Sequence, residues 1–71
     1  MFTMPVQVAF DKVGSTEIST VNLEDMSAGP VRWETCVFRD NGDSQVIGRY
    51  TSLESALRGH DRAIYEVTAG G

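Results

Sequence analysis

Apolar and polar residues alternate along short segments of the chain, and this alternation predicts β-strands. Val6 to Phe10 alternates with a period of two, and Thr16 to Leu23 is rich in β-branched residues. Asp11 to Gly14 has turn composition, since Gly14 adopts a positive φ at little steric cost. We therefore expect an N-terminal hairpin, although residues 1–15 carry the weakest pattern in the chain.

A second hairpin is predicted by Val31 to Arg39 and Gln45 to Tyr50, which flank Asp40-Asn41-Gly42-Asp43. The Asn-Gly pair favours a two-residue type I′ turn, because both central positions of that turn need a positive φ. Such a turn fixes the register of the two strands. The predicted cross-strand pairs are Val37 with Val46, Cys36 with Ile47, Glu34 with Arg49, and Trp33 with Tyr50.

The last third of the chain changes to a helical period. Thr51 is predicted as the N-cap, and Glu54 completes a capping box. Gly59 is interpreted as permitting a close approach of the helix to Trp33 or Phe38. Two surface ion pairs are predicted, Glu54 with Arg58 and Arg62 with Glu66. The apolar stripe consists of Leu53, Ala56, Leu57, His60, Ile64 and Val67.

These elements predict an α+β fold, in which a small antiparallel sheet of three to four strands precedes one C-terminal amphipathic helix packed on one face. The 71 residues suffice for a single domain. Residues 1–15 form its weakly patterned N-terminal segment, residues 16–67 its core and residues 68–71 a tail, of which residues 69–71 are expected to fray. Residues 24–30 have loop composition. A core of this size usually provides roughly 3–5 kcal/mol of net folding stability, so the domain could gain further stability by associating with another chain.

The second hairpin carries apolar residues on both faces, whereas one helix covers only one face of a small sheet. The other face needs cover from the N-terminal segment, a second copy of the chain or a partner protein. On the predicted register, the first face carries Trp33, Val37, Val46 and Tyr50. The candidate partner or dimer face on the other side comprises Glu34, Cys36, Phe38, Ile47 and Arg49.

Charge and composition narrow the classes of function. The formal net charge is −4, with ten acidic against six basic residues, which argues against nucleic-acid binding. Cys36 is the only cysteine, so no intramolecular disulfide is expected. The N-terminal residues do not resemble a secretory signal, and no segment approaches the roughly 20 apolar residues of a membrane helix. We expect a soluble, cytoplasmic protein that does not bind membranes.

Candidate catalytic residues are few. His60, the only histidine, could act as a general base or pH switch, but its place on the apolar stripe favours a hydrogen-bonded histidine at the edge of the core. Cys36 lies mid-strand, which favours a half-buried structural thiol. The segment from Asp40 to Asp43 lacks the rest of a calcium loop. No catalytic, cofactor-binding or metal site is predicted, and the chain is not expected to be an enzyme.

Several short motifs follow one another in a recognisable order: Ser19-Thr20-Val21, then Trp33 to Phe38, then Arg49-Tyr50-Thr51 with Glu54 and Ala56, then Gly59-His60. In these motifs the chain resembles small uncharacterised proteins of bacteriophages and prophages of high-GC Gram-positive (actinobacterial) hosts, over about residues 18–67. It departs from them at Cys36, where Met is usual, and at Arg39, where Gly is usual. The resemblance implies a phage or prophage origin and a bacterial host cytoplasm, but no activity.

The surplus apolar face, the small size and the absence of a catalytic motif together favour a function in protein–protein binding. If the phage resemblance holds, the partner is a host protein, such as a component of antiviral defence that the chain modulates or inhibits. The alternatives are a virion structural or assembly protein and a simple homo-oligomer. A nucleic-acid-binding module is a more remote alternative.

Overall fold

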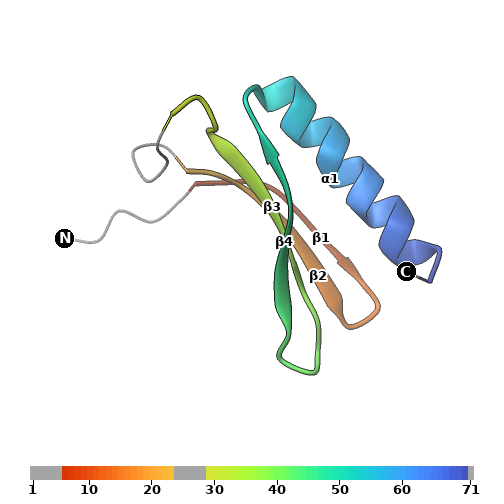
Figure 1. Ribbon diagram of the computed structural model, residues 1–71. Coiled ribbons are helices and arrows are strands. Elements are labelled where there is room, and N and C mark those ends of the chain that lie inside the picture. Colours follow the sequence, from red (N-terminus) through yellow and green to blue (C-terminus); the bar gives the residue numbers. More distant parts are fainter. Residues whose placement is uncertain (1–5, 24–28, 71) are drawn as a thin grey trace.

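The structure is a computed structural model, and it describes residues 6–23 and 29–70. Four strands form one antiparallel sheet in the order β1-β2-β3-β4, and the C-terminal helix packs against one face of it (Figure 1). The predicted α+β fold is therefore confirmed. Its elements are β1 (Val6–Val13), β2 (Thr16–Asn22), β3 (Trp33–Phe38), β4 (Ser44–Tyr50) and α1 (Leu53–Thr68).

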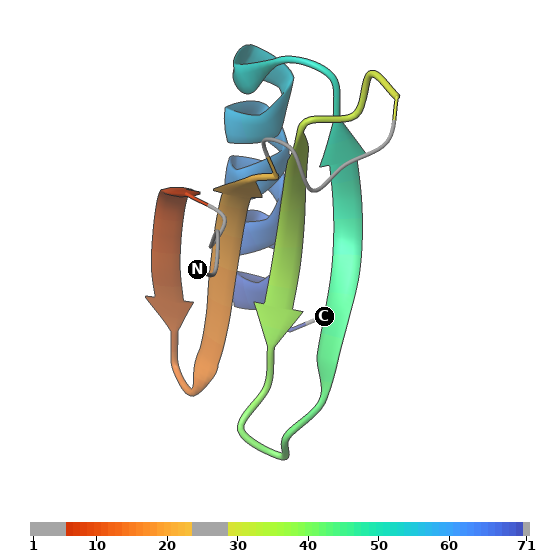
Figure 2. The same ribbon diagram turned by 90° about the vertical axis from the view of Figure 1, so that its left-hand side faces the viewer.

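The sheet and the helix form two layers. The helix α1 contacts all four strands. Figure 2 looks onto the sheet from the side away from the helix, with the four strands next to one another and α1 behind them. Since successive side chains of a strand point to opposite faces, each strand places half of its side chains toward α1 and half away from it.

The buried interior of the described residues is small and half polar. Val13, Ile64 and Val67 pack, partly buried, around an apolar cluster formed by Ile18, Val37 and Ala63. The fully buried residues of the helix are small, and its larger contribution to the apolar interior comes from the partly buried Ile64 and Val67. The fully buried hydrophobic residues are Ile18, Val37, Ala56 and Ala63, and the buried polar ones are Ser19, Thr20, Thr35 and His60.

The N-terminal hairpin is confirmed, but its turn is shorter than predicted. Asp11 and Lys12 belong to β1, where they pair with Ile18 and Glu17. The chain reverses at Gly14 and Ser15, and Gly14 has a φ of 61°. Of the loop predicted for residues 24–30, only residues 29 and 30 are among those that the structure describes, and they form a turn.

The predicted two-residue turn between β3 and β4 is wrong. The backbone N–H of Arg39 donates to Asp43 O at 2.8 Å, and that of Gly42 donates to Arg39 O at 3.1 Å. The loop therefore has three residues and ends in Gly42, whose φ of 93° is the left-handed conformation that such loops require. Asn41 Oδ1 accepts a hydrogen bond from the N–H of Asp43 at 2.9 Å, which supports the longer loop.

The register of this hairpin is partly as predicted. Trp33 pairs with Tyr50 and Glu34 with Arg49, as expected. A β-bulge then shifts the remaining pairs by one residue and leaves Ile47 as the extra residue of β4. The predicted pairs of Val37 with Val46 and Cys36 with Ile47 are therefore wrong. The observed pairs beyond the bulge are Cys36 with Val46, Val37 with Gln45, and Phe38 with Ser44.

The helix begins one residue later than predicted. Its N-cap is Ser52, whose Oγ accepts a hydrogen bond from the backbone N–H of Ser55 at 3.1 Å. Thr51 and Glu54 therefore do not form the predicted capping box. Thr51 and Ser52 are both good caps, and the sequence alone does not decide between adjacent candidates. At the other end, the N–H of Ala69 donates to Tyr65 O at 2.9 Å. Ala69 therefore caps the helix, where a frayed tail was predicted.

The inward face of α1 is rotated relative to the predicted stripe. Ala56, His60 and Ala63 are its buried residues. Leu53 and Leu57, predicted on the stripe, are 45% and 41% exposed. Of the two predicted ion pairs, Glu54 with Arg58 is confirmed at 3.3 Å, and Arg62 does not pair with Glu66.

Gly59 lies where the helix comes closest to β4. A Cβ atom placed there would overlap the hydroxyl group of Tyr50, and so would one at Gly48. The Tyr50 ring is therefore enclosed by two glycines, one on β4 and one on α1. The predicted close approach at Gly59 is confirmed, but its partner is Tyr50 and not Trp33 or Phe38.

We predict that Gly59→Ala destabilises the protein even though alanine favours helix by about 1 kcal/mol. The Tyr50 ring must move out of its site, and displacing a packed side chain costs about 1–3 kcal/mol. In a Tyr50→Leu background, which removes the overlapping atoms, the same substitution should instead stabilise by about 0.5–1 kcal/mol. Urea unfolding of the native protein, the two single variants and the double variant measures both effects. Stabilisation by Gly59→Ala in the native background contradicts this packing.

Candidate functional site

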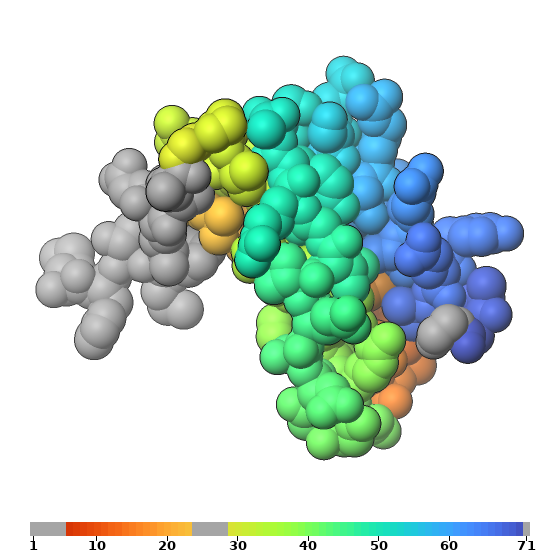
Figure 3. Space-filling view, viewed as in Figure 1, coloured from red at the N-terminus to blue at the C-terminus, as the bar shows by residue number. Residues whose placement is uncertain are grey.

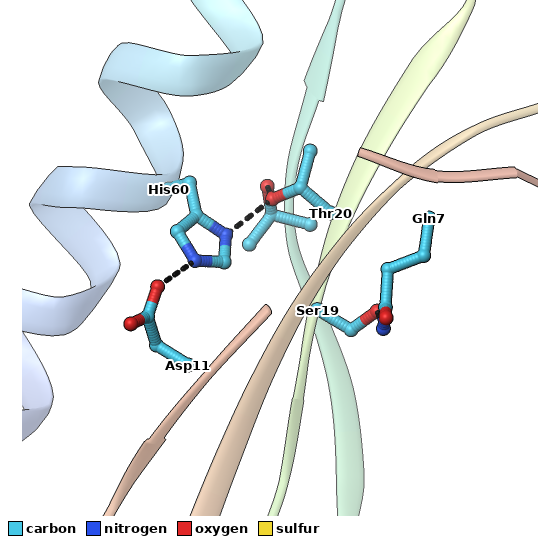
Figure 4. A network of polar contacts seen from close by, with 6 residues as sticks. Gln7, Asp11, Ser19, Thr20 and His60 are labelled. Carbon is cyan, nitrogen blue, oxygen red and sulfur yellow. Dashed lines mark hydrogen bonds and ion pairs between the residues drawn. The ribbon is translucent and has the colours of Figure 1, made fainter. Parts of the chain in front are cut away.

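A line of side-chain hydrogen bonds crosses the interior between the sheet and the helix. The hydroxyl oxygens of Thr35 and Thr20 are 2.6 Å apart, and Thr20 Oγ1 is 2.7 Å from His60 Nδ1. On the other side of the imidazole ring, His60 Nε2 is 2.8 Å from Asp11 Oδ2 (Figure 4). We call Thr35, Thr20, His60 and Asp11 the His60 network. It joins α1 to β1, β2 and β3.

Each residue of the His60 network is positioned by the strand or helix on which it lies. Thr20 and Thr35 are cross-strand partners on the side of the sheet that faces the helix. His60 is on the inward face of α1, between Ala56 and Ala63. Asp11 lies on the neighbouring edge strand, where its side chain stays 52% exposed. The network thus runs from the fully buried threonines to a carboxylate at the surface.

The chemistry of Asp11 sets the direction of these hydrogen bonds. An ionised carboxylate only accepts, so His60 Nε2 carries the proton that is donated to Asp11. In the neutral imidazole, Nδ1 then accepts from the hydroxyl of Thr20, and Thr20 accepts in turn from Thr35. All three buried members therefore have a partner, which is the condition for a buried polar network to stabilise a fold.

An aspartate, a histidine and a hydroxyl group in this order also make up catalytic triads. Here the hydroxyl belongs to Thr20, which is 0% exposed, and His60 is only 2% exposed. A substrate would not reach the Thr20 hydroxyl in this arrangement. The prediction of a hydrogen-bonded histidine at the core is confirmed. Its partners were missed, because Thr20 and Asp11 lie 40 and 49 residues away in sequence.

The other candidate site is the surface of the sheet on the side away from α1, which we call the open face. Strand pairing arranges its side chains in three rows across the four strands. The middle row is Phe10, Ser19, Cys36 and Val46, one flanking row is Lys12, Glu17, Phe38 and Ser44, and the other is Gln7, Val21, Glu34 and Arg49. Figure 2 looks onto this face, and no helix of the described residues covers it.

The apolar side chains of the open face are accessible to solvent. Phe10 is 48% exposed, Phe38 42% and Val46 40%. Ser19, between them, is held by a 2.8 Å hydrogen bond from Gln7 Nε2 to its Oγ. The middle row therefore exposes Phe10 and Val46 on the two edge strands, with the buried Ser19 and the half-buried Cys36 between them, and it carries no charge.

The two flanking rows carry charges of both signs. Arg49 Nε is 3.2 Å from Glu34 Oε2, and Lys12 lies across from Glu17. Two acidic and two basic residues leave the open face without net formal charge, although the whole chain carries −4. The negative charge of the protein therefore lies elsewhere than on this face.

Cys36 is at the centre of the open face and is half-buried. Burial raises the pKa of its thiol, and so do a 3.5 Å hydrogen bond to Glu34 Oε1 and the negative charge of that carboxylate, against a smaller opposite effect of Arg49. A raised pKa keeps the thiol protonated, whereas the thiolate is the reactive form. This environment agrees with the predicted structural thiol.

Four residues of the predicted partner face lie together on the open face: Glu34, Cys36, Phe38 and Arg49. The fifth, Ile47, is the bulge residue of β4 and is 41% exposed. Val46 takes the place opposite Cys36 that was predicted for Ile47. The prediction also missed Phe10, because no local pattern predicts the register between β1 and the rest of the sheet.

Within residues 6–23 and 29–70, no three His, Cys, Asp or Glu side chains gather where they could hold a metal ion. The same residues include no helix with the length and apolar character of a membrane span.

Comparisons with the families of known proteins, with curated protein sequences and with solved structures found no match. The resemblance to phage proteins therefore stays a prediction.

We predict that native Cys36 reacts with iodoacetamide several-fold more slowly at pH 8 than the same thiol in the urea-unfolded chain. Because its pKa is raised, less thiolate is present at that pH, and the rate should climb as the pH increases. Glu34→Gln removes a negative charge next to the thiol and should accelerate the reaction. Glu66→Gln on the helix is the matched control and should not. Equal rates in the native and unfolded chains contradict the assigned environment.

Proposed function

We propose that this protein acts without catalysis, by protein–protein binding through the open face, and that the occupant of this face is a second copy of the chain. The observation that carries the proposal is the order of the three rows. An uncharged middle row with Phe10, Cys36 and Val46 lies between two rows that carry charges, and protein interfaces have a similar order of less polar centre and polar rim.

The charges of the open face favour a second copy over a strongly charged partner. Two chains of net charge −4 repel each other at long range. At the open face this repulsion is locally absent, because Lys12 faces Glu17 and Arg49 faces Glu34 within each chain. A symmetric pair places the uncharged middle rows of the two copies against each other, as a two-fold interface requires.

The edges of the sheet are less suited to association. Both edge strands are interrupted, β1 by a bulge between Gln7 and Ala9, and β4 by the bulge at Ile47. Bulges on edge strands disfavour the pairing of one sheet edge with another. Face-to-face packing of two sheets, with one helix on each outer side, therefore fits the fold better than extension of the sheet.

The size of the face predicts a weak dimer. Four strands of six to eight residues give a face of about 19 by 23 Å, on the order of 400 Å² in projection. A stable interface buries about 800 Å² of accessible surface per partner. We therefore expect association at micromolar to millimolar concentrations.

The resemblance to phage proteins supplies the proposed setting, the cytoplasm of a bacterial host. It also supplies the alternative occupant of the open face, a host protein. The two occupants are distinguished by the behaviour of the purified chain, since only a second copy produces association in the absence of other proteins.

We predict that light scattering of the purified protein shows a mass that rises from that of one chain toward that of two with concentration. Val46→Lys, which places a charge in the middle row, should abolish this rise. The matched control is Leu57→Lys, because Leu57 is 41% exposed on α1 and Val46 is 40% exposed.

A native chain that stays monomeric at millimolar concentration overturns the assignment of a second copy and leaves the open face to a different protein. Unchanged association of Val46→Lys overturns the assignment of the surface. Circular dichroism shows that both variants are folded before these comparisons are made.

A further inference from the structure

A groove lies between Tyr50, at the end of β4, and one flank of α1. Figure 3 shows β4 and α1 packed next to each other in a space-filling view. The volume of the groove is about 260 Å³. Tyr50 contributes from the end of β4, and four residues at helical spacing contribute from α1. The lining residues are Tyr50, Ser55, Arg58, Gly59 and Arg62. The groove does not include any residue of the open face or of the His60 network.

The groove is basic, although the protein is acidic. Two of its lining residues are arginines and none is a carboxylate, whereas the chain has a net charge of −4. Arg58 and Arg62 are four residues apart on one helix, a spacing at which like charges repel. A bound anion between them would remove this repulsion.

Neither arginine is strongly engaged within the protein. The ion pair of Arg58 with Glu54 joins two side chains that are 72% and 80% exposed, so solvent screens it. Arg62 makes no ion pair with any residue that the structure describes, and the predicted partner Glu66 does not approach it. Both guanidinium groups are therefore available to a ligand.

Two hydroxyl groups complete the set of donors. Ser55 Oγ accepts a 2.9 Å hydrogen bond from Ser52, which leaves its own hydrogen free to be donated. The Tyr50 hydroxyl makes no hydrogen bond within residues 6–23 and 29–70, and it lies against Gly59. Since a side chain at position 59 would overlap Tyr50, glycine there keeps this hydroxyl in the groove.

We infer that this groove binds the phosphate group of a small phosphate monoester. Guanidinium groups bind phosphate oxygens through two parallel hydrogen bonds. Two guanidinium and two hydroxyl donors provide more hydrogen bonds than the two oxygens of a carboxylate use, and they suit the three terminal oxygens of a phosphate monoester. A volume of about 260 Å³ is just below the usual range for small-molecule sites, roughly 300–1,000 Å³, so a small ester fits better than a dinucleotide.

The test is a titration of the ¹⁵N-labelled protein with glycerol phosphate, inorganic phosphate and acetate at constant ionic strength, followed by NMR. Glycerol phosphate should produce saturable shifts of the amide signals of Tyr50, Ser55 and Gly59 and of the Arg58 and Arg62 side chains. Weaker binding of inorganic phosphate identifies an ester as the ligand, and equal binding identifies free phosphate. Acetate should bind at least tenfold more weakly than either.

Two pairs of variants localise the site. Arg62→Gln should weaken glycerol phosphate binding at least tenfold, whereas Arg39→Gln, the same change of charge in the β3–β4 turn, should leave it unaltered. Tyr50→Phe removes only the hydroxyl and should weaken binding several-fold, and Tyr65→Phe on the exposed side of α1 should not. None of these side chains is fully buried, so the variants should fold.

Shifts that do not saturate, or that spread over the whole chain, overturn the proposal, because they indicate a general response to salt. Equal affinity of Arg62→Gln and the native protein also overturns it. So does binding of acetate as strong as that of phosphate.

Discussion

The position of the helix on the sheet depends on the His60 network. Of the fully buried apolar residues, α1 supplies only Ala56 and Ala63, while its Ile64 and Val67 are partly buried against the core. This apolar packing is non-directional, so by itself it does not select one orientation of the helix. His60 adds hydrogen bonds to β2 and β1, and hydrogen bonds have strict preferences of distance and angle. They therefore fix the rotation of α1 about its axis, and this rotation decides which flank of the helix meets β4.

The docked helix leaves two surfaces available for binding, and they differ in character. The flank of α1 beside β4 presents Arg58 and Arg62, while Gly59 admits the Tyr50 ring beneath them. The opposite side of the sheet is left with an uncharged middle row between rows of balanced charge. His60 is enclosed between the sheet and the helix, and Cys36 lies on the open face with its thiol held protonated. Both environments agree with the proposal that the protein acts by binding.

Much of the fold could be predicted from the sequence because local patterns specify it. Alternating strands, the glycine turns and the helical period are properties of neighbouring residues. The bulge at Ile47 could not be predicted, since a three-residue loop and a bulge together satisfy the same Trp33–Tyr50 pair as a two-residue loop without one. The His60 network could not be predicted either, because no local sequence pattern indicates that Asp11 and His60 lie next to each other in the fold. The groove was missed for the same reason: its tyrosine and arginines meet only after the helix has docked.

The most direct test of this account is a double-mutant cycle between His60→Leu and Thr20→Val, with free energies of unfolding measured in urea. Each substitution removes the hydrogen bond between the two buried side chains, at a cost of about 1–3 kcal/mol. The double variant removes both groups, so its loss should be smaller than the sum of the two single losses by more than about 1 kcal/mol. Losses that add to within about 0.3–0.5 kcal/mol would show that the two side chains are not coupled, and would contradict the central role of the network.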